Sequence, residues 1–112
     1  MLFDVRTYTC RPGMVKAHLA LYEKEGYPVQ SRHLGKPLLY GITETGPQNS
    51  YVHIWVYASA QDRADRRAAL QKDPEWIAYL KRSSEAGYVV SQENRLVVPA
   101  PFFSLADPAP AS

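Results

Sequence analysis

The chain has 112 residues and a formal net charge of +2 at pH 7, with 46% hydrophobic and 21% charged residues, a composition typical of one small globular domain. Its 13 basic residues are interspersed with 11 acidic ones, and no run approaches the roughly 18 apolar residues of a membrane span, so we expect neither nucleic acid nor membrane as a partner. Cys10 is the only cysteine and no basic, apolar leader precedes the first strand, so we expect no internal disulfide and a cytoplasmic location.

The first third of the chain predicts a strand followed by a helix. Residues 2–9 alternate apolar side chains with polar or aromatic ones, the period-two pattern of a strand. Pro12 suits the first turn of a helix, and apolar residues follow at spacings of four and three until Gly26 and Pro28 interrupt the pattern. For residues 29–36 a loop and a short second helical turn both remain open.

A β-hairpin is predicted next. Residues 38–45 and 50–57 are rich in β-branched and aromatic side chains, and the segment between them, Gly-Pro-Gln-Asn, favours chain reversal.

The last third predicts a helix in two segments and a final strand. Ser59 followed by Asp62 resembles a capping box at the start of a helix that runs to residue 72. Asp73 and Pro74 then form the cap and first turn of a second segment that ends at Gly87.

Residues 88–98 are β-prone, and the prolines that follow end this strand. We therefore predict one domain over residues 1–103 and a Pro/Ala-rich tail over residues 104–112.

The order of elements is β-α-β-β-α-β, which predicts a ferredoxin-like α+β fold: a four-stranded antiparallel sheet with the helices on one face. The other sheet face would be bare. Pairing two such faces across a two-fold axis would cover them, so we expect a homodimer.

The third predicted strand has two unlike faces. Val52, Ile54 and Val56 form an apolar stripe typical of a core. The other face carries the rings of Tyr51, His53, Trp55 and Tyr57, and such a face fits either a pocket or a dimer interface.

The first and third strands are neighbours in this fold, so Asp4, Arg6 and Tyr8 can share a face with His53 if the register allows it. Asp4 could orient its neighbours, Arg6 could bind an oxyanion, and His53 could act as a general acid or base. The alternative is a satisfied buried polar network without catalysis.

Substrate-binding candidates surround this cluster. Tyr40, Trp55 and Tyr57 could line a slot for a planar substrate, although strand aromatics are more often core. Arg66, with the arginines at positions 63 and 67, could hold a carboxylate, although a solvated helix face is the simpler interpretation. Trp76 and Tyr79 are best explained as anchors of the last helix.

The histidines match no metal-binding spacing and no phosphate loop occurs, so we predict no metal and no cofactor.

The sequence also resembles a known family through nine short motifs spread over residues 2–103 in one order. They are DVRTY (4–8), RPG (11–13), YG (40–41), ETGP (44–47), HIW (53–55), RADRR (63–67), DPEW (73–76), QEN (92–94) and PAPF (99–102). Together they are similar to the NIPSNAP family. The resemblance implies a dimeric α/β barrel, a superfamily that includes cofactor-free monooxygenases, lactone isomerases and haem-degrading enzymes.

Two functions remain open at this point. The first is a small-molecule binding protein, or a cofactor-independent monooxygenase or isomerase-like enzyme, acting on an aromatic or polyketide-like acid. It requires an enclosed cavity. The second is a non-catalytic dimeric interaction module whose aromatic face is filled by the dimer interface. Haem degradation fits less well, because no histidine follows His53.

Overall fold

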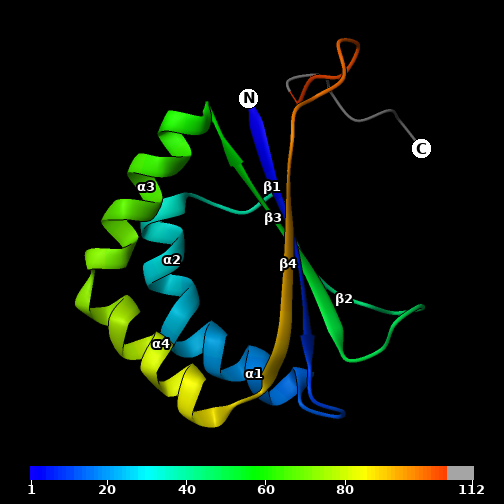
Figure 1. The fold of residues 1–112 in the computed structure, drawn as a ribbon, viewed down its shortest axis with the longest axis vertical. Helices are drawn as coiled ribbons and strands as arrows, with labels where there is room; N and C mark the ends of the chain where they lie inside the picture. The colour runs from blue at the N-terminus through cyan, green and yellow to red at the C-terminus, as the bar shows by residue number, and fades with distance from the viewer. Residues whose placement is uncertain (106–112) are drawn as a thin grey trace.

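A computed structural model describes residues 1–105. Its four strands form one antiparallel sheet in the order β2-β3-β1-β4. The strands are β1 (Leu2–Cys10), β2 (Leu39–Ile42), β3 (Ser50–Tyr57) and β4 (Val89–Val97). All helices cover the same face of this sheet (Figure 1). The predicted ferredoxin-like α+β fold is confirmed.

The register between β1 and β3 brings the predicted polar cluster together. Arg6 lies opposite His53, Asp4 opposite Trp55, and Tyr8 opposite residue 51. Because side chains alternate along a strand, these residues share one face of the sheet. Residue 40 of β2 also pairs with His53.

The first helical arm is longer than the sequence predicted. It comprises α1 (Val15–Leu21), a π-helical turn labelled η1 (Tyr22–Gly26) and α2 (Tyr27–Leu34). The expected interruption at Gly26 and Pro28 is wrong. Pro28 lies in the first turn of α2, directly after the π-helical turn, where the change of helical hydrogen-bonding pattern accommodates its missing N–H. Gly26 is needed for packing, since an added Cβ would lie 2.8 Å from a ring atom of Tyr22 and 3.0 Å from the ring of Tyr79.

The second arm begins and ends as predicted. It consists of α3 (Ala60–Lys72) and α4 (Pro74–Ala86). The Ser59 hydroxyl accepts from the backbone N–H of Asp62 at 3.1 Å, and the Asp62 carboxylate accepts from the N–H of residue 58 at 2.9 Å. Both hydrogen bonds of a capping box are therefore present, except that the carboxylate accepts from the N–H of residue 58 and not from that of the cap residue.

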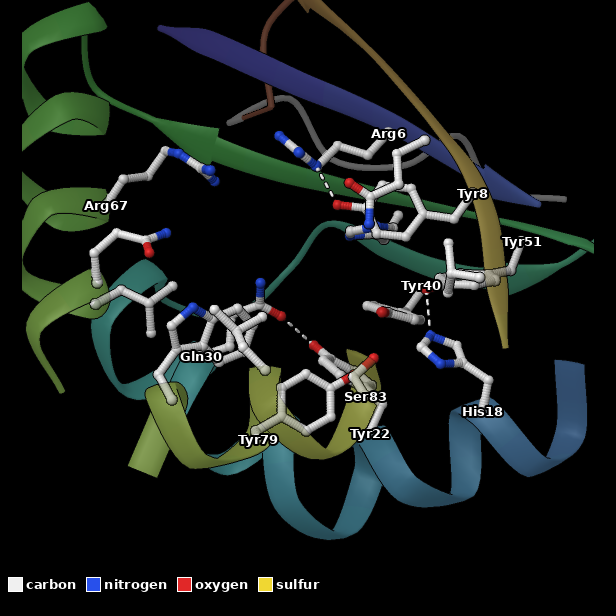
Figure 2. Close-up of a pocket in the computed structure, with 17 residues that line it drawn as sticks. Arg6, Tyr8, His18, Tyr22, Gln30, Tyr40, Tyr51, Arg67, Tyr79 and Ser83 are labelled. Carbon is white, nitrogen blue, oxygen red and sulfur yellow. Dashed lines mark hydrogen bonds between the residues drawn. The ribbon is translucent and has the colours of Figure 1, made fainter. Parts of the chain in front are cut away.

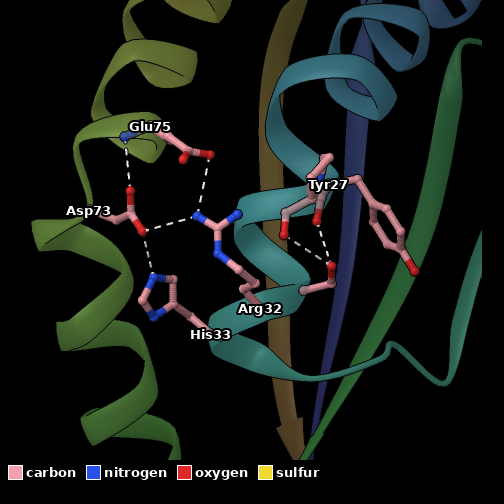
Figure 3. Close-up of polar contacts among 7 residues, drawn as sticks. Tyr27, Arg32, His33, Asp73 and Glu75 are labelled. Carbon is pink, nitrogen blue, oxygen red and sulfur yellow. Dashed lines mark hydrogen bonds and ion pairs between the residues drawn. The ribbon is translucent and has the colours of Figure 1, made fainter.

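A polar cluster at the α3–α4 junction joins the two arms (Figure 3). Asp73 caps α4 and lies 2.8 Å from His33 Nε2 of α2. Arg32, also in α2, lies 3.4 Å from Asp73 and 3.3 Å from Glu75. The hydrogen bond from His33, helped by the Glu75 backbone N–H, lowers the pKa of Asp73. This cluster ties α2 to the second arm beside the sheet.

The structure corrects the expectation for the apolar stripe of β3 and selects one of the two alternatives for its ring-bearing face. The ring-bearing face lies under the helices, where Trp55 and Tyr57 belong to the main core. The stripe of Val52, Ile54 and Val56 lies on the open face of the sheet and is only half-buried. The ring-bearing face therefore cannot serve as a dimer interface. It is the inner wall of the domain.

Candidate functional site

A cavity of about 180 Å³ lies between the sheet and the helices. Arg6 and Tyr8 reach into it from the sheet, Arg67 from α3, and Tyr79 and Ser83 from α4 (Figure 2). Its lining residues come from every strand and from both helical arms. They are Arg6, Tyr8, His18, Tyr22, Gln30, Tyr40, Tyr51, His53, Arg67, Leu70, Gln71, Trp76, Tyr79, Leu80, Ser83, Val89 and Gln92.

His53 is fixed in one tautomer by its neighbour. Only 2% of the residue is exposed, and its Nδ1 accepts a hydrogen bond of 2.7 Å from the indole N–H of Trp55. An indole N–H can only donate, so the neutral imidazole carries its proton on Nε2. That Nε2 atom is buried and has no partner within residues 1–105. His53 therefore lines the cavity with a spare hydrogen-bond donor.

His53 does not titrate near neutral pH. Burial, with the positive charge of Arg6 added to it, lowers the pKa of His53 to about 3. Its ring stacks on Tyr40 at 4.7 Å and meets the edge of Tyr8 at 4.8 Å. The predicted acid–base role needs a pKa close to the working pH. The geometry instead suits a neutral donor that polarises an oxygen atom.

Asp4 holds Arg6 in place. The Arg6 guanidinium donates to the Tyr8 hydroxyl at 2.9 Å and to Asp4 at 3.1 Å. Asp4 is fully buried and also accepts from Arg63 at 3.1 Å and from Asn94 at 3.2 Å. Burial alone would raise the pKa of Asp4, but these partners outweigh it and lower the pKa. Asp4 is thus an ionised positioning group behind the cavity wall.

The three arginines of α3 point to different places. Arg63 turns toward the sheet and pairs with Asp4. Arg67 lines the cavity, whereas Arg66, the predicted substrate ligand, lies outside the lining and pairs with Asp62 at 2.9 Å. Helical spacing alone could not separate Arg66 from Arg67, because the tilt of α3 over the sheet decides which one faces inward.

The charged side chains in the described lining of the cavity are all positive. Two arginines line the cavity, and among the residues described around it no Asp or Glu does. Four of its phenols stay neutral at pH 7, since burial raises the pKa of Tyr22, Tyr40 and Tyr51, and raises that of Tyr79 to about 12. The cavity therefore favours an anionic or electron-rich ligand.

Two of the predicted ligand-binding rings lie outside the lining. Trp55 and Tyr57 are each 1% exposed and pack into the core, and Trp55 supports His53 from outside the lining. Conversely, Trp76 and Tyr79 line the cavity as well as anchoring α4. The sequence could not reveal this, because a ring on the inner face of a helix has the same spacing in both roles.

His18 is a functional candidate that the sequence gave no reason to select. It is 3% exposed, and its Nε2 lies 2.6 Å from the Tyr51 hydroxyl (Figure 2). Its Nδ1 is buried without a partner in the described part of the chain. Burial lowers the pKa of His18, so this second imidazole is also neutral at pH 7.

The cavity borders a surface hollow between α4 and β4. That hollow measures about 520 Å³ and shares four lining residues with the cavity: Leu80, Ser83, Val89 and Gln92. A ligand can approach along this side. Over residues 1–105, no three His, Cys, Asp or Glu side chains gather as a metal site would require, and no helix is long and apolar enough to cross a membrane.

Comparisons with known proteins agree on one family. The NIPSNAP family profile matches residues 3–104. A "Protein NipSnap homolog" from Dictyostelium discoideum is 26% identical over 98 residues, which cover 88% of this chain and 42% of that protein. A solved NIPSNAP family protein of unknown function from Agrobacterium tumefaciens is 39% identical, with a TM-score of 0.85 over 94% of this chain and 93% of that one.

A more distant similarity concerns the fold alone. SnoaB, a cofactor-independent oxygenase from Streptomyces nogalater, is 16% identical, with a TM-score of 0.62 over 95% of this chain and 97% of that one. The chain spans only about two-fifths of the length of the first curated relatives it matches, 42% and 40%.

Proposed function

This chain belongs to the NIPSNAP family, and from that premise we propose that its cavity binds a small ring-bearing organic acid and stabilises the anionic form of that acid. The observation that carries the proposal is a cavity lined by two partly buried arginines, a buried spare imidazole N–H and, in the described residues, no carboxylate. An anion is the ligand that such a lining can satisfy.

Arg6 supplies a preorganised positive charge. Its Nε and one terminal nitrogen are held by Tyr8 and Asp4, which leaves its remaining N–H groups for a ligand. Asp4 cannot neutralise the site alone, because it is shared between Arg6 and Arg63 while Arg67 adds a further charge. The net local charge favours a carboxylate, phenolate or enolate.

His53 acts as a neutral electrophile in this proposal. A donor that is already aligned and shielded from water stabilises an oxygen atom as negative charge develops on it. Trp55 keeps the imidazole in the donating tautomer. The chemistry open to this site is thus anion stabilisation, with His53 donating a hydrogen bond and Arg6 supplying charge.

The cavity limits the size of the ligand. A cavity of about 150 Å³ is large enough for one benzene ring, and this one measures about 180 Å³. Its walls include the rings of Tyr8, Tyr40 and Tyr79, which favour flat apolar contact. One aromatic or enolic ring with a small acidic group fits this volume.

Stabilising an anion would support two reactions. An enolate or phenolate can take a proton at a different carbon, which is an isomerisation, or it can react with dioxygen, as in a cofactor-independent oxygenation. The fold shared with the Streptomyces oxygenase is compatible with the second reaction. Consumption of dioxygen by the protein with a bound enolisable ring acid would separate the two.

The test of ligand binding compares benzoate with benzamide by titration calorimetry. Benzoate should bind the wild-type protein more tightly, because benzamide keeps the ring but lacks the charge. Arg67→Ala should weaken benzoate about ten- to hundredfold, the range for losing a hydrogen bond to a charged group in a buried site.

Arg66→Ala is the matched control for that variant. It removes the same charge from the neighbouring position of α3, but Arg66 points out of the cavity toward Asp62. Equal losses from Arg66→Ala and Arg67→Ala would mean that long-range attraction, and not the cavity, holds benzoate. Failure of the wild-type protein to prefer benzoate would overturn the proposal.

A non-catalytic interaction module is less well supported. That hypothesis needs the ring-bearing face at a dimer interface and a filled interior, but this face lies under the helices beside a cavity.

The open apolar face of the sheet instead supports the expected homodimer. Its groove includes Val5, Ile54 and the 41% exposed Val97. Ile54→Asp should yield a monomer by light scattering if this face pairs two copies; a variant that stays dimeric would exclude it.

A further inference from the structure

We propose that Trp76 is a second recognition point in the cavity, and that its indole N–H donates to a neutral oxygen acceptor on the ligand, away from the ligand's acidic group. This inference rests on the proposed binding of a ring acid. It narrows the ligand to a ring that carries both an acidic group and a separate carbonyl-type oxygen.

The burial of Trp76 motivates this proposal. Only 7% of the residue is exposed, and it lines the cavity. Its Nε1 atom is inaccessible to solvent and has no acceptor in the part of the chain that the structure describes. An indole N–H is a donor only, and buried donors in proteins nearly always have a partner. Because Trp76 lines the cavity, an oxygen of a bound ligand would supply the missing acceptor.

Trp55 provides an internal comparison. It is also buried, at 1% exposed, but its Nε1 donates to His53 at 2.7 Å. One tryptophan of this domain therefore has the partner that burial requires, and the other does not. The difference lies in position, since both tryptophans belong to the core cluster but only Trp76 also lines the cavity.

The two spare donors lie on opposite walls. His53 belongs to β3 of the sheet, whereas Trp76 belongs to α4. Figure 2 shows these two walls facing one another, with Arg6 on the sheet side and Tyr79 of α4 on the helix side. A ligand that satisfies both donors needs oxygen atoms at two separate positions.

The charged residues of the lining indicate which cavity wall the acidic group of the ligand contacts and which wall its neutral oxygen contacts. Arg6 lies opposite His53 in the sheet, so the acidic group belongs at that wall. The lining residues of α4 beside Trp76 are uncharged: Tyr79 packs on it at 5.2 Å, and its helical neighbour Leu80 also lines the cavity, while Arg67 lines it from α3. A neutral ketone, ester or amide oxygen suits the uncharged indole donor, because the acidic group of the ligand takes the arginines.

The first test uses a matched pair of probes, the acetylbenzoates and the isopropenylbenzoates, each as the ortho, meta and para isomers. The two series have nearly the same shape, but a methylene replaces the ketone oxygen in the second. At least one acetylbenzoate should bind wild-type protein about three- to tenfold more tightly than its isopropenyl partner, the range for one neutral hydrogen bond. Trp76→Phe should abolish that preference while benzoate still binds.

The outcomes separate this inference from the proposed function. If no ring acid binds, the proposed function fails and the inference falls with it. If ring acids bind in an Arg67-dependent way but no isomer prefers the ketone, or the preference survives Trp76→Phe, then only the inference is overturned and the indole is bonded to water.

A second measurement needs no variant, in case Trp76→Phe does not fold. The chain has two tryptophans, so ¹⁵N-labelled protein gives two indole N–H signals. Binding of the preferred acetylbenzoate should shift the Trp76 signal downfield and slow its exchange with solvent, relative to the isopropenyl partner. The Trp55 signal should not distinguish the two probes. Equal responses of Trp76 to both probes would overturn the inference.

Discussion

Acidification should destabilise this protein through His53 well above the pH at which carboxylates protonate. The pKa of His53 is lowered by burial and by Arg6 to about 3 in the folded protein, against an ordinary value of 6.5. Between these values the unfolded chain binds a proton that the folded chain does not, so the free energy of unfolding rises with pH. Above about pH 6.5 both states are neutral at this residue and its contribution to the pH dependence ends.

The size of the effect follows from the gap between the two pKa values. Each pH unit inside the gap changes the free energy of unfolding by up to about 1.4 kcal/mol. Lowering the pH from 7 to 5 should therefore remove about 2 kcal/mol through His53 alone. His18 acts in the same direction, because burial lowers its pKa too. Asp4 does not interfere, since its lowered pKa places its effect below about pH 4.

The assay is urea unfolding at pH 7, 6 and 5 for the wild-type protein and for His53→Asn. Asparagine can keep an acceptor for the Trp55 indole but does not titrate. The variant should be less stable at pH 7, yet its stability should fall by about 2 kcal/mol less than that of the wild type on going to pH 5. Parallel pH dependences of the two proteins would refute the reasoning, as would an imidazole NMR titration placing the pKa of folded His53 near 6.5.

Three further substitutions probe the scaffold by urea unfolding at pH 7. Asp4→Asn should lower the free energy of unfolding by about 3–5 kcal/mol, because it leaves Arg6 partly buried without its anion; a loss below about 1 kcal/mol would contradict the network. Gly26→Ala should lower it by about 1–3 kcal/mol, since the new Cβ would lie 2.8 Å from a tyrosine ring atom, and a neutral outcome would show that the π-helical turn can adjust. Ser59→Ala should lower it by about 1 kcal/mol through loss of the α3 cap; no change would mean that the cap contributes nothing.

Local patterns were sufficient to predict the fold. Alternation along residues 2–9 and 50–57 fixed which side chains share a sheet face, and the observed pairing of Arg6 with His53 agrees with it. The cap at Asp73 and the stop at Gly87 lie where their backbone chemistry requires, and Gly87 adopts a φ of 64°.

The errors arose where tertiary packing overrides local preference. Gly26 is a weak helix former, but its missing side chain lets the ring of Tyr79 approach the first arm, so the helix continues through it. Histidine has an ordinary pKa close to neutrality, but burial next to Arg6 removes His53 from that range. Neither effect can be seen from neighbours in the sequence.

The sequence by itself determined the order of the elements, the placement of Asp4 and Arg6 on one strand face, and the family, because periodicity, caps and turn residues act over a few positions. Only the tertiary structure decided that the ring-bearing face lies under the helices, that Arg67 and not Arg66 faces the cavity, and that Trp76 presents an unpaired N–H. These depend on how helices tilt over a sheet, and the tilt follows from packing between residues far apart in the chain.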